Sequence, residues 1–414
     1  MKKLKISIAS LLVAASALVG CDNAEYGTLG THAYINESVS SLSRSTKVVL
    51  DSEEGANVQI TVCLSSKSEA DAQFRLVVDE AVLKSYNEAQ SASYTVMPEE
   101  LFELPESITI SEGKFNADPV SIHINQIPAD MAGEMYAIPL RLESIDGKIP
   151  TTSASSTFVI TIESIAVSTL PMFDGGAGLA TQEGFPMSLD KFTVEVRFQI
   201  SDTANRNRAV FTNGGSNGSL VLLRFEDPQN DETNDAGEVV TAAHSLVQFQ
   251  GDNGFLNPTT AFVPNKWQHL AVTYDGTKIT IYVNGAFAGS KDLVVKSEFK
   301  QAGWFGGSVP GGEPDGGDGG HGTDDSWWNG CKILCTEARI WSVCRTEAQI
   351  QNNMTTVSPS SEGLEAYWRF NEGSGTTFED CTGHGHTLTT TKNPTWIPGI
   401  KSNDPSTPWP GESK

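Results

Sequence analysis

The sequence is short of positive charge and of long apolar segments, and each shortage excludes a class of protein. It has 28 Lys and Arg against 51 Asp and Glu, a formal net charge of −23 at pH 7. This balance argues against binding nucleic acid or an anionic membrane surface through electrostatics. The one marked apolar run, residues 6–19, is too short for a permanent transmembrane helix. No other segment approaches that length, so no membrane-spanning helix is predicted.

Cysteine is scarce as well, and five of the six cysteines follow Cys21. An odd number in an oxidising compartment leaves at least one thiol free or in an intermolecular bond. The CxxxC spacing at 331–335 is neither a zinc-ribbon nor a thioredoxin motif, so zinc is not predicted. One or two disulfides are expected among the four C-terminal cysteines, which are Cys331, Cys335, Cys344 and Cys381.

The sequence also lacks a recognisable catalytic set. There is no HExxH motif and no phosphate-binding glycine loop. GGSNG at 214–218 matches the GxSxG pattern, but that pattern requires a helix after the serine, whereas the strand-like LVLLRF follows. We interpret it as a hairpin turn, and we expect no enzymatic activity.

The N-terminus carries the features of an export signal. Three lysines precede the apolar run, as in a signal peptide, which we place at residues 1–20. LVGC at 18–21 resembles a lipobox, in which Cys21 would receive lipid and become the new N-terminus. The resemblance implies a lipoprotein of the outer membrane, attached through its lipid alone. Asp22 and Glu25 are compatible with acidic surface-export tags, so we expect exposure at the cell surface; an ordinary signal peptide is the alternative.

The rest of the chain is too long for one ordinary core, and its patterns predict two β-domains. In the first half, NVQITVCL at 57–64 and TFVITI at 157–162 alternate apolar and polar residues, as half-buried antiparallel strands do. DEAVLKSYNEA at 79–89 has helical spacing and predicts one short helix. Residues 21–164 are therefore expected to form a small β-sandwich of Ig-like size.

The boundary is expected near 163–171, where the strand pattern gives way to a link. Beyond it, FTVEVRFQI at 192–200 predicts a strand with four apolar residues on one face and Glu195, Arg197 and Gln199 on the other.

Tight hairpins are predicted at Asp275-Gly276 and Asn284-Gly285. Many short strands without a long helix predict a larger sandwich or jelly roll over 165–400, followed by a C-terminal tail at 401–414.

Two resemblances to known families support this all-β organisation. YTVMPEELFELPESITISEGKFNADPVSIHI (94–124) and YAIPLRLESIDGK (136–148) resemble the domain of unknown function 1735 of Bacteroidota surface lipoproteins, which implies a spacer or assembly module. KWQHLAVTYDGTKITIYVNGAFAG (266–289), ARIWSVCRTEAQI (338–350) and LEAYWRFNEGSGTTFEDCTGHGH (364–386) resemble laminin-G-like jelly rolls of the concanavalin A-like lectin and glucanase superfamily. That resemblance implies two curved antiparallel sheets with ligand sites on the concave face or at the rim. The Glu-x-Asp-x-x-Glu strand of its glucanases is missing here.

Local patterns within these motifs predict structure more than chemistry. Trp267, Trp341 and Trp368 lie in alternating strands and are expected in the core. Thr346 and Gln349 have the spacing of a capping box, which predicts one short helix after Trp341.

The second resemblance also implies a calcium ion at the rim of the sandwich. The matching residues are Asp174 in FDGG and Asp380 in EDCTGHG. Calcium takes six to eight oxygen ligands, so two carboxylates from opposite ends of the domain are reasonable anchors. The alternative is that both residues cap the backbone of their own turns.

The segment GWFGGSVPGGEPDGGDGGHGTDDSWWNG at 303–330 is the most unusual in the chain. It is rich in glycine and acid, it is an insertion relative to the family pattern, and tryptophans bracket it. Aromatic rings stack on sugars, and Asp, Asn and His can hydrogen-bond hydroxyls. The candidate ligand-binding residues are therefore Trp327, Trp304, His321, Asp324 and Asp325. Trp328 matches a core aromatic position of the family, and a buried position is the alternative for Trp304.

We therefore expect non-catalytic binding of an extracellular polysaccharide or oligosaccharide, with outer-membrane transport partners in a glycan-uptake system. This last step is analogy, because fold does not fix function. The alternatives are a protein-binding or adhesion module, and a glycoside hydrolase with an unrecognised carboxylate pair.

Overall fold

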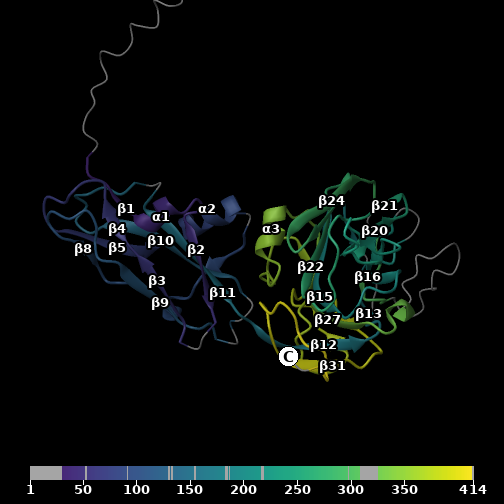
Figure 1. The fold of residues 1–414 in the computed structure, drawn as a ribbon. Coiled ribbons are helices and arrows are strands. Elements are labelled where there is room, and N and C mark those ends of the chain that lie inside the picture. The colour runs from purple at the N-terminus through teal and green to yellow at the C-terminus, as the bar shows by residue number, and fades with distance from the viewer. Residues whose placement is uncertain are drawn as a thin grey trace, which may run out of the picture.

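The computed structural model describes residues 30–412 except 52–53, 91, 129–130, 132–133, 153–154, 182–184, 186, 216–218, 297 and 308–324. It contains two β-domains that lie side by side, the first in purple and blue and the second in teal to yellow (Figure 1). None of the described helices is long and apolar enough to cross a membrane. The predicted all-β class is confirmed. The signal segment and Cys21 lie outside the described residues.

The first domain is a sandwich with two short helices. One sheet has the order β2-β11-β10-β5-β8 with β6 beside β10, a second has the order β3-β9-β7, and β1 pairs with β4. The bounds are β1 (Ala33–Ile35), α1 (Asn36–Ser40), β2 (Ser45–Leu50), β3 (Ala56–Ile60), β4 (Val62–Leu64), β5 (Ala72–Val78), α2 (Glu80–Gln90), β6 (Thr95–Val96), η2 (Glu99–Leu101), β7 (Phe102–Glu103), β8 (Ile108–Ile110), β9 (Val120–Ile124), β10 (Tyr136–Ser144) and β11 (Thr157–Ser164).

The predicted helix is α2, and it lies on one face of the first domain's large sheet. Its buried Leu83 packs on Ala137 of β10 and Val159 of β11. Most strand pairs are antiparallel as predicted, but β2 runs parallel to β11, and β6 runs parallel to β10. Alternation along a strand does not report the direction of its neighbour, so these two pairings could not be predicted.

The second domain packs two sheets of eight strands against each other. The β15 sheet has the order β24-β23-β22-β15-β27-β12-β31 with β28 beside β27, and the β16 sheet has the order β21-β20-β17-β16-β26-β13-β30-β29. Two further pairs are β14-β25 and β18-β19. The bounds are β12 (Val167–Asp174), β13 (Leu179–Thr181), β14 (Met187–Ser188), β15 (Phe192–Ile200), β16 (Arg208–Thr212), β17 (Leu222–Asp227), β18 (Glu232–Thr233), β19 (Val239–Thr241), β20 (Leu246–Gly251), β21 (Gly254–Leu256), β22 (Gln268–Tyr274), β23 (Lys278–Val283), β24 (Ala286–Asp292), β25 (Glu298–Phe299), β26 (Gly303–Trp304), η4 (Asp325–Trp328), β27 (Lys332–Trp341), α3 (Glu347–Asn352), β28 (Leu364–Trp368), β29 (Thr377–Phe378), β30 (Leu388–Thr389) and β31 (Thr395–Lys401).

Local signals in this domain predicted structure correctly. Asn284 and Gly285 both have positive φ, as a two-residue hairpin requires, and they join β23 to β24. The Thr346 side chain accepts from the Gln349 backbone while Gln349 caps the Thr346 backbone, so the capping box that begins α3 is confirmed. Trp267, Trp341 and Trp368 are all buried.

The outer face of the β15 sheet corrects one expectation. All nine residues of β15 are buried, including Glu195, Arg197 and Gln199, which the alternation placed on a polar face. The chain after Lys401 covers this face, because the Gln199 amide and the Trp267 indole both bond to Thr407. The predicted C-terminal tail is therefore part of the second domain.

The connection between the domains is shorter than predicted. β11 ends at Ser164 and β12 begins at Val167, so only residues 165–166 join them. Pro171 lies inside β12, opposite Trp396 of β31. Because the link is this short, α2 of the first domain and α3 of the second lie near each other (Figure 1).

The structure also corrects the expectation of a disulfide. The five described cysteines are all free, so the disulfide expected among the four C-terminal cysteines is not formed. Cys331 and Cys335 are buried within the domain core. Burial raises the pKa of both thiols, which makes them poor nucleophiles.

Candidate functional site

The rim of the second domain beside β16 carries the exposed tryptophan that the sequence singled out. Trp327 lies in the single turn η4, and its side chain is 40% exposed. Its neighbour Trp328 is fully buried, packs at 5.8 Å from Phe305 between ring centroids, and donates its indole N–H to Ala209 O at 3.1 Å. One tryptophan of the pair therefore anchors the turn and leaves the other at the surface.

A buried arginine fixes the same turn from below. Arg208, at the start of β16, is 1% exposed and donates from Nε to Trp327 O at 3.1 Å. Its Nη1 donates to the backbone and the carboxylate of Asp202, at 2.9 and 2.7 Å. The guanidinium also lies 5.6 Å from the centroid of the Trp328 ring. These charge-assisted bonds fix the backbone of the turn, so the Trp327 side chain projects from a defined position at the rim.

Polar groups surround this turn and could accept or donate hydrogen bonds. Ser326 and Asn329 flank the two tryptophans and are exposed, and the Asp202 side chain is one-third exposed. Asp174 at the end of β12 is exposed as well, and the next residue, Gly175, donates its N–H to Cys331 O at 2.9 Å. An aromatic ring with amide, hydroxyl and carboxylate groups at a rim is an arrangement that suits a neutral polyol.

The other residues predicted for this loop have different positions. Trp304 is 0% exposed and packs against Phe211 and Trp368, so its proposed role as a ligand-binding ring is corrected to a core role. His321 and Asp324 lie outside the described residues. Asp325 begins η4.

The two aspartates proposed as calcium ligands are far apart. Asp174 pairs with Lys332 of β27, whereas Asp380 accepts from the backbone of Tyr367, which pairs with Arg339 of the same strand. These two positions on β27 are separated by about 23 Å at roughly 3.3 Å per residue. One ion with ligands at about 2.4 Å therefore cannot bind both carboxylates, which corrects that pairing.

The Asp380 carboxylate instead organises its own turn. It accepts from the backbone of Thr382 at 3.0 Å and of His386 at 3.1 Å. This is the capping alternative considered for that residue. Among the residues that the structure describes, no group of three or more His, Cys, Asp or Glu could hold a metal ion.

A buried ionic cluster that the sequence did not predict lies under α3. Glu195 is 0% exposed and accepts from Trp341 Nε1 at 2.6 Å and from Arg345. Its other oxygen lies 3.1 Å from His269 Nε2 and 3.6 Å from Arg339 Nη1. Burial alone would raise the pKa of Glu195, but the cations lower it more, so the carboxylate is ionised. We attribute a structural role to this cluster because it is closed to solvent.

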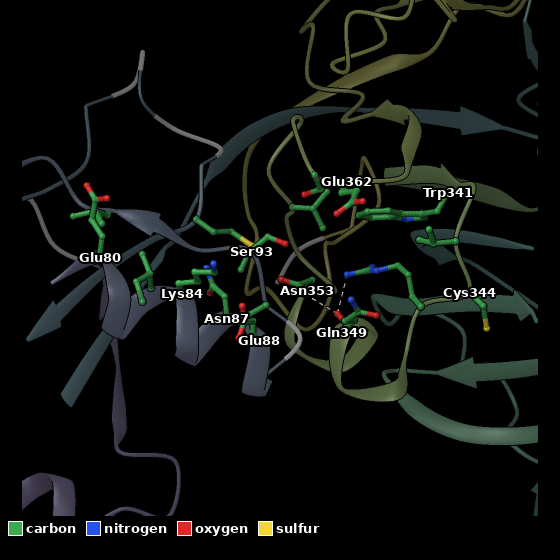
Figure 2. A pocket seen from close by; sticks show the side chains of 18 residues that line it. Glu80, Lys84, Asn87, Glu88, Ser93, Trp341, Cys344, Gln349, Asn353 and Glu362 are labelled. Atoms are coloured by element: carbon green, nitrogen blue, oxygen red, sulfur yellow. Dashed lines mark hydrogen bonds between the residues drawn. The ribbon is translucent and has the colours of Figure 1, made fainter. Parts of the chain in front are cut away.

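A cavity lies between the two domains, and sequence reasoning missed it entirely (Figure 2). Its volume is about 750 Å³, within the range of small-molecule sites. One wall is a stripe of α2 and the other is the surface around α3; the polar residues labelled on them are Glu80, Lys84, Asn87, Glu88, Ser93, Gln349, Asn353 and Glu362. The helical spacing of the α2 residues was the only available signal, and it gave no indication of what the stripe faces.

Comparisons with family models agree with the two-domain architecture. Residues 173–351 match the model described as the concanavalin A-like lectin/glucanases superfamily. The second domain is concanavalin A-like. Residues 29–149 match the model of an N-terminal domain family. No curated protein matches the chain.

Solved structures also resemble this chain. A protein of Bacteroides ovatus ATCC 8483, described as a candidate carbohydrate binding protein, is 21% identical and superposes with a TM-score of 0.52, covering 91% of this chain and 99% of its own. At this identity the likeness concerns the fold.

Two further matches are more distant. One is a multidomain protein of Bacteroides ovatus that includes the domain of unknown function 1735. It is 13% identical with a TM-score of 0.23, and the match covers 73% of this chain and 92% of its own. A heptameric SAP-like pentraxin of Limulus polyphemus is 14% identical over 45% of this chain and 79% of its own, with a TM-score of 0.28.

Proposed function

We propose that this protein binds carbohydrate without catalysis, through the rim turn that presents Trp327. The observation that carries the proposal is the contrast within η4, where buried Trp328 and Arg208 anchor the turn whose next residue, Trp327, is 40% exposed. An indole face offers a flat apolar surface on which the C–H face of a sugar ring can stack. The neighbouring Ser326, Asn329 and Asp202 supply the hydrogen-bonding groups.

The concanavalin A-like domain and its likeness to a candidate carbohydrate binding protein of Bacteroides ovatus support the same ligand class. We extend the proposal to a lipoprotein anchored through Cys21 at the outer membrane, with the first domain as spacer and glycan-uptake proteins as partners. The lipid anchor in that extension rests on the export signal in the sequence, and the spacer and the uptake partners rest on the two family resemblances.

Affinity electrophoresis of the full chain in polysaccharide-containing gels tests the proposal. The expected result is retardation by at least one polysaccharide, and its loss on Trp327→Ala. The matched control is Phe287→Ala on β24, because Phe287 is 55% exposed and lies in the same domain. Each gel is run with calcium and with a chelator, since a requirement for calcium would indicate an ion at the rim.

Three results would count against the proposal. Equal retardation of the wild type and Trp327→Ala would remove η4 from the site. No retardation by any polysaccharide, with the protein folded, would favour a protein partner instead. Release of reducing sugar by the purified protein would favour the hydrolase alternative, so the same incubations are assayed for it.

A further inference from the structure

The rim around Trp327 contains a carboxylate whose two oxygens have different surroundings. Asp202 Oδ1 accepts from Arg208 Nη1 at 2.7 Å and from the Ala204 backbone at 3.0 Å. Among the described residues, Oδ2 has one weak contact, from Ser201 Oγ at 3.5 Å. Each carboxylate oxygen can accept about two hydrogen bonds, so Oδ2 has room for further donors. Because the side chain is 34% exposed, Oδ2 is the oxygen that a ligand can reach.

The guanidinium of Arg208 links Asp202 to the turn that carries Trp327. It donates from Nε to Trp327 O at 3.1 Å and from Nη1 to the Asp202 backbone at 2.9 Å. Because the donating nitrogens belong to one planar group, Trp327 O and Asp202 Oδ1 lie within about 8 Å of each other. The Cys331 thiol also donates to Asp202 O, at 3.5 Å. Asp202 is therefore held beside η4, where a sugar chain stacked on Trp327 can reach Oδ2.

The cations of the rim are engaged with other groups. The rim segments 201–208 and 325–332 contain three of them. Arg208 is 1% exposed, so its charge cannot meet a ligand. Arg206 forms an ion pair with a buried glutamate, and Lys332 lies beside a tryptophan on the outer face of the β15 sheet, with 6.0 Å between Nζ and the ring centroid. A ligand that reaches Oδ2 therefore meets negative charge without a counter-charge from these segments.

We propose that Asp202 makes the rim selective for neutral glycans over glycans that carry carboxylate or sulfate groups. A sugar hydroxyl donates to Oδ2 while the sugar ring stacks on Trp327, and a hydrogen bond to a charged acceptor is stronger than one to a neutral acceptor. An anionic group at the same place would meet a like charge, which costs binding free energy. The inference rests on the function proposed for the Trp327 rim and names the class of glycan that the rim takes.

Isothermal titration calorimetry of the full chain tests the selectivity with two ligands that share one backbone. They are the neutral polysaccharide that retards the wild type most strongly in the gels, and a carboxymethylated derivative of it. The wild type is expected to bind the neutral form at least about tenfold more tightly. High salt should leave the affinity for the neutral form unchanged and raise the affinity for the derivative, because salt screens repulsion between exposed charges.

Asp202→Asn separates the local effect from the net charge of the protein. Its amide oxygen can still accept from Arg208 and Ala204, and its NH2 group takes the place of Oδ2. The neutral polysaccharide should bind roughly fivefold or more weakly, whereas the derivative should bind more tightly. Damage to the fold would weaken both. Asp235→Asn, in the exposed turn between β18 and β19, removes the same charge and is the matched control, with changes below about twofold expected.

The outcomes distinguish failure of the selectivity from failure of the proposed function. Equal affinity of the wild type for both ligands, or changes in the same direction for Asp202→Asn, would overturn the role of Asp202 and leave the proposed function intact. Retardation by anionic polysaccharides alone, lost on Trp327→Ala, would reverse the selectivity and keep the rim as the site. Absence of retardation by every polysaccharide would overturn the proposed function and this inference together.

Discussion

Replacing Glu195 with glutamine tests the buried cluster of the second domain. The substitution keeps the shape of the side chain and an oxygen that can accept from Trp341. It removes the only carboxylate that, among the described residues, forms an ion pair with Arg345. Arg339 is less affected because Glu337 pairs with it as well. The main loss is therefore one buried guanidinium without a counter-charge.

The size of the effect follows from that loss. Removing one partner of a buried ion pair costs about 3–5 kcal/mol, because the remaining charge stays desolvated. We expect Glu195→Gln to lower the free energy of unfolding by about 3 kcal/mol at pH 7. This value is at the lower end of that range because the hydrogen bond from the Trp341 indole is retained. Urea unfolding followed by tryptophan fluorescence measures it, and Glu347→Gln on the exposed side of α3 is the control, with less than about 0.5 kcal/mol expected.

The pH dependence gives a second, independent measurement. The pKa of Glu195 is lower in the folded than in the unfolded protein, so the folded state gains stability from the charge above the unfolded value of 4.5. That gain is lost as the pH falls below 4.5. The difference between wild type and Glu195→Gln should therefore be full at pH 7 and shrink in acid. A difference below about 1 kcal/mol at pH 7, or one that grows in acid, would refute the reasoning.

Two further predictions concern the rim and the thiols. Arg208→Lys should lower the free energy of unfolding by about 2 kcal/mol, because a lysine ammonium cannot bond to both Trp327 O and Asp202 as the guanidinium does. It should also weaken retardation by polysaccharide. Full retention of stability and of retardation would contradict the argument that Arg208 fixes the turn. Iodoacetamide should modify the half-buried Cys344 before the buried Cys335, because burial raises the pKa of the Cys335 thiol. Mass spectrometry maps the labelled sites. The reverse order would contradict the core position of Cys335.

The features predicted from sequence are those that neighbouring residues determine. The hairpin at Asn284-Gly285 needs a local backbone that asparagine and glycine adopt readily, and the capping box of α3 needs only Thr346 and Gln349. Alternation likewise identified the strands, because a period of two is a property of each strand alone.

The features that were missed depend on residues distant in the chain. The polar residues of β15 alternate as those of a solvent-facing strand would, yet Gln199 is covered by Thr407, 208 residues further on. The cavity between α2 and α3 has walls from both domains, so it depends on how the two domains pack. No pattern within either domain reports what the other domain places beside it.

Trp327 and Trp328 show why the candidate site could be named but not built from the sequence. They are adjacent and chemically identical, so composition alone cannot separate their roles. The difference arises at Arg208, 119 residues earlier, which donates a hydrogen bond to the backbone carbonyl of Trp327, while the indole of Trp328 lies beside its guanidinium. A ring becomes a binding surface only when its neighbours are held in place by the core, and for η4 that support comes from β16.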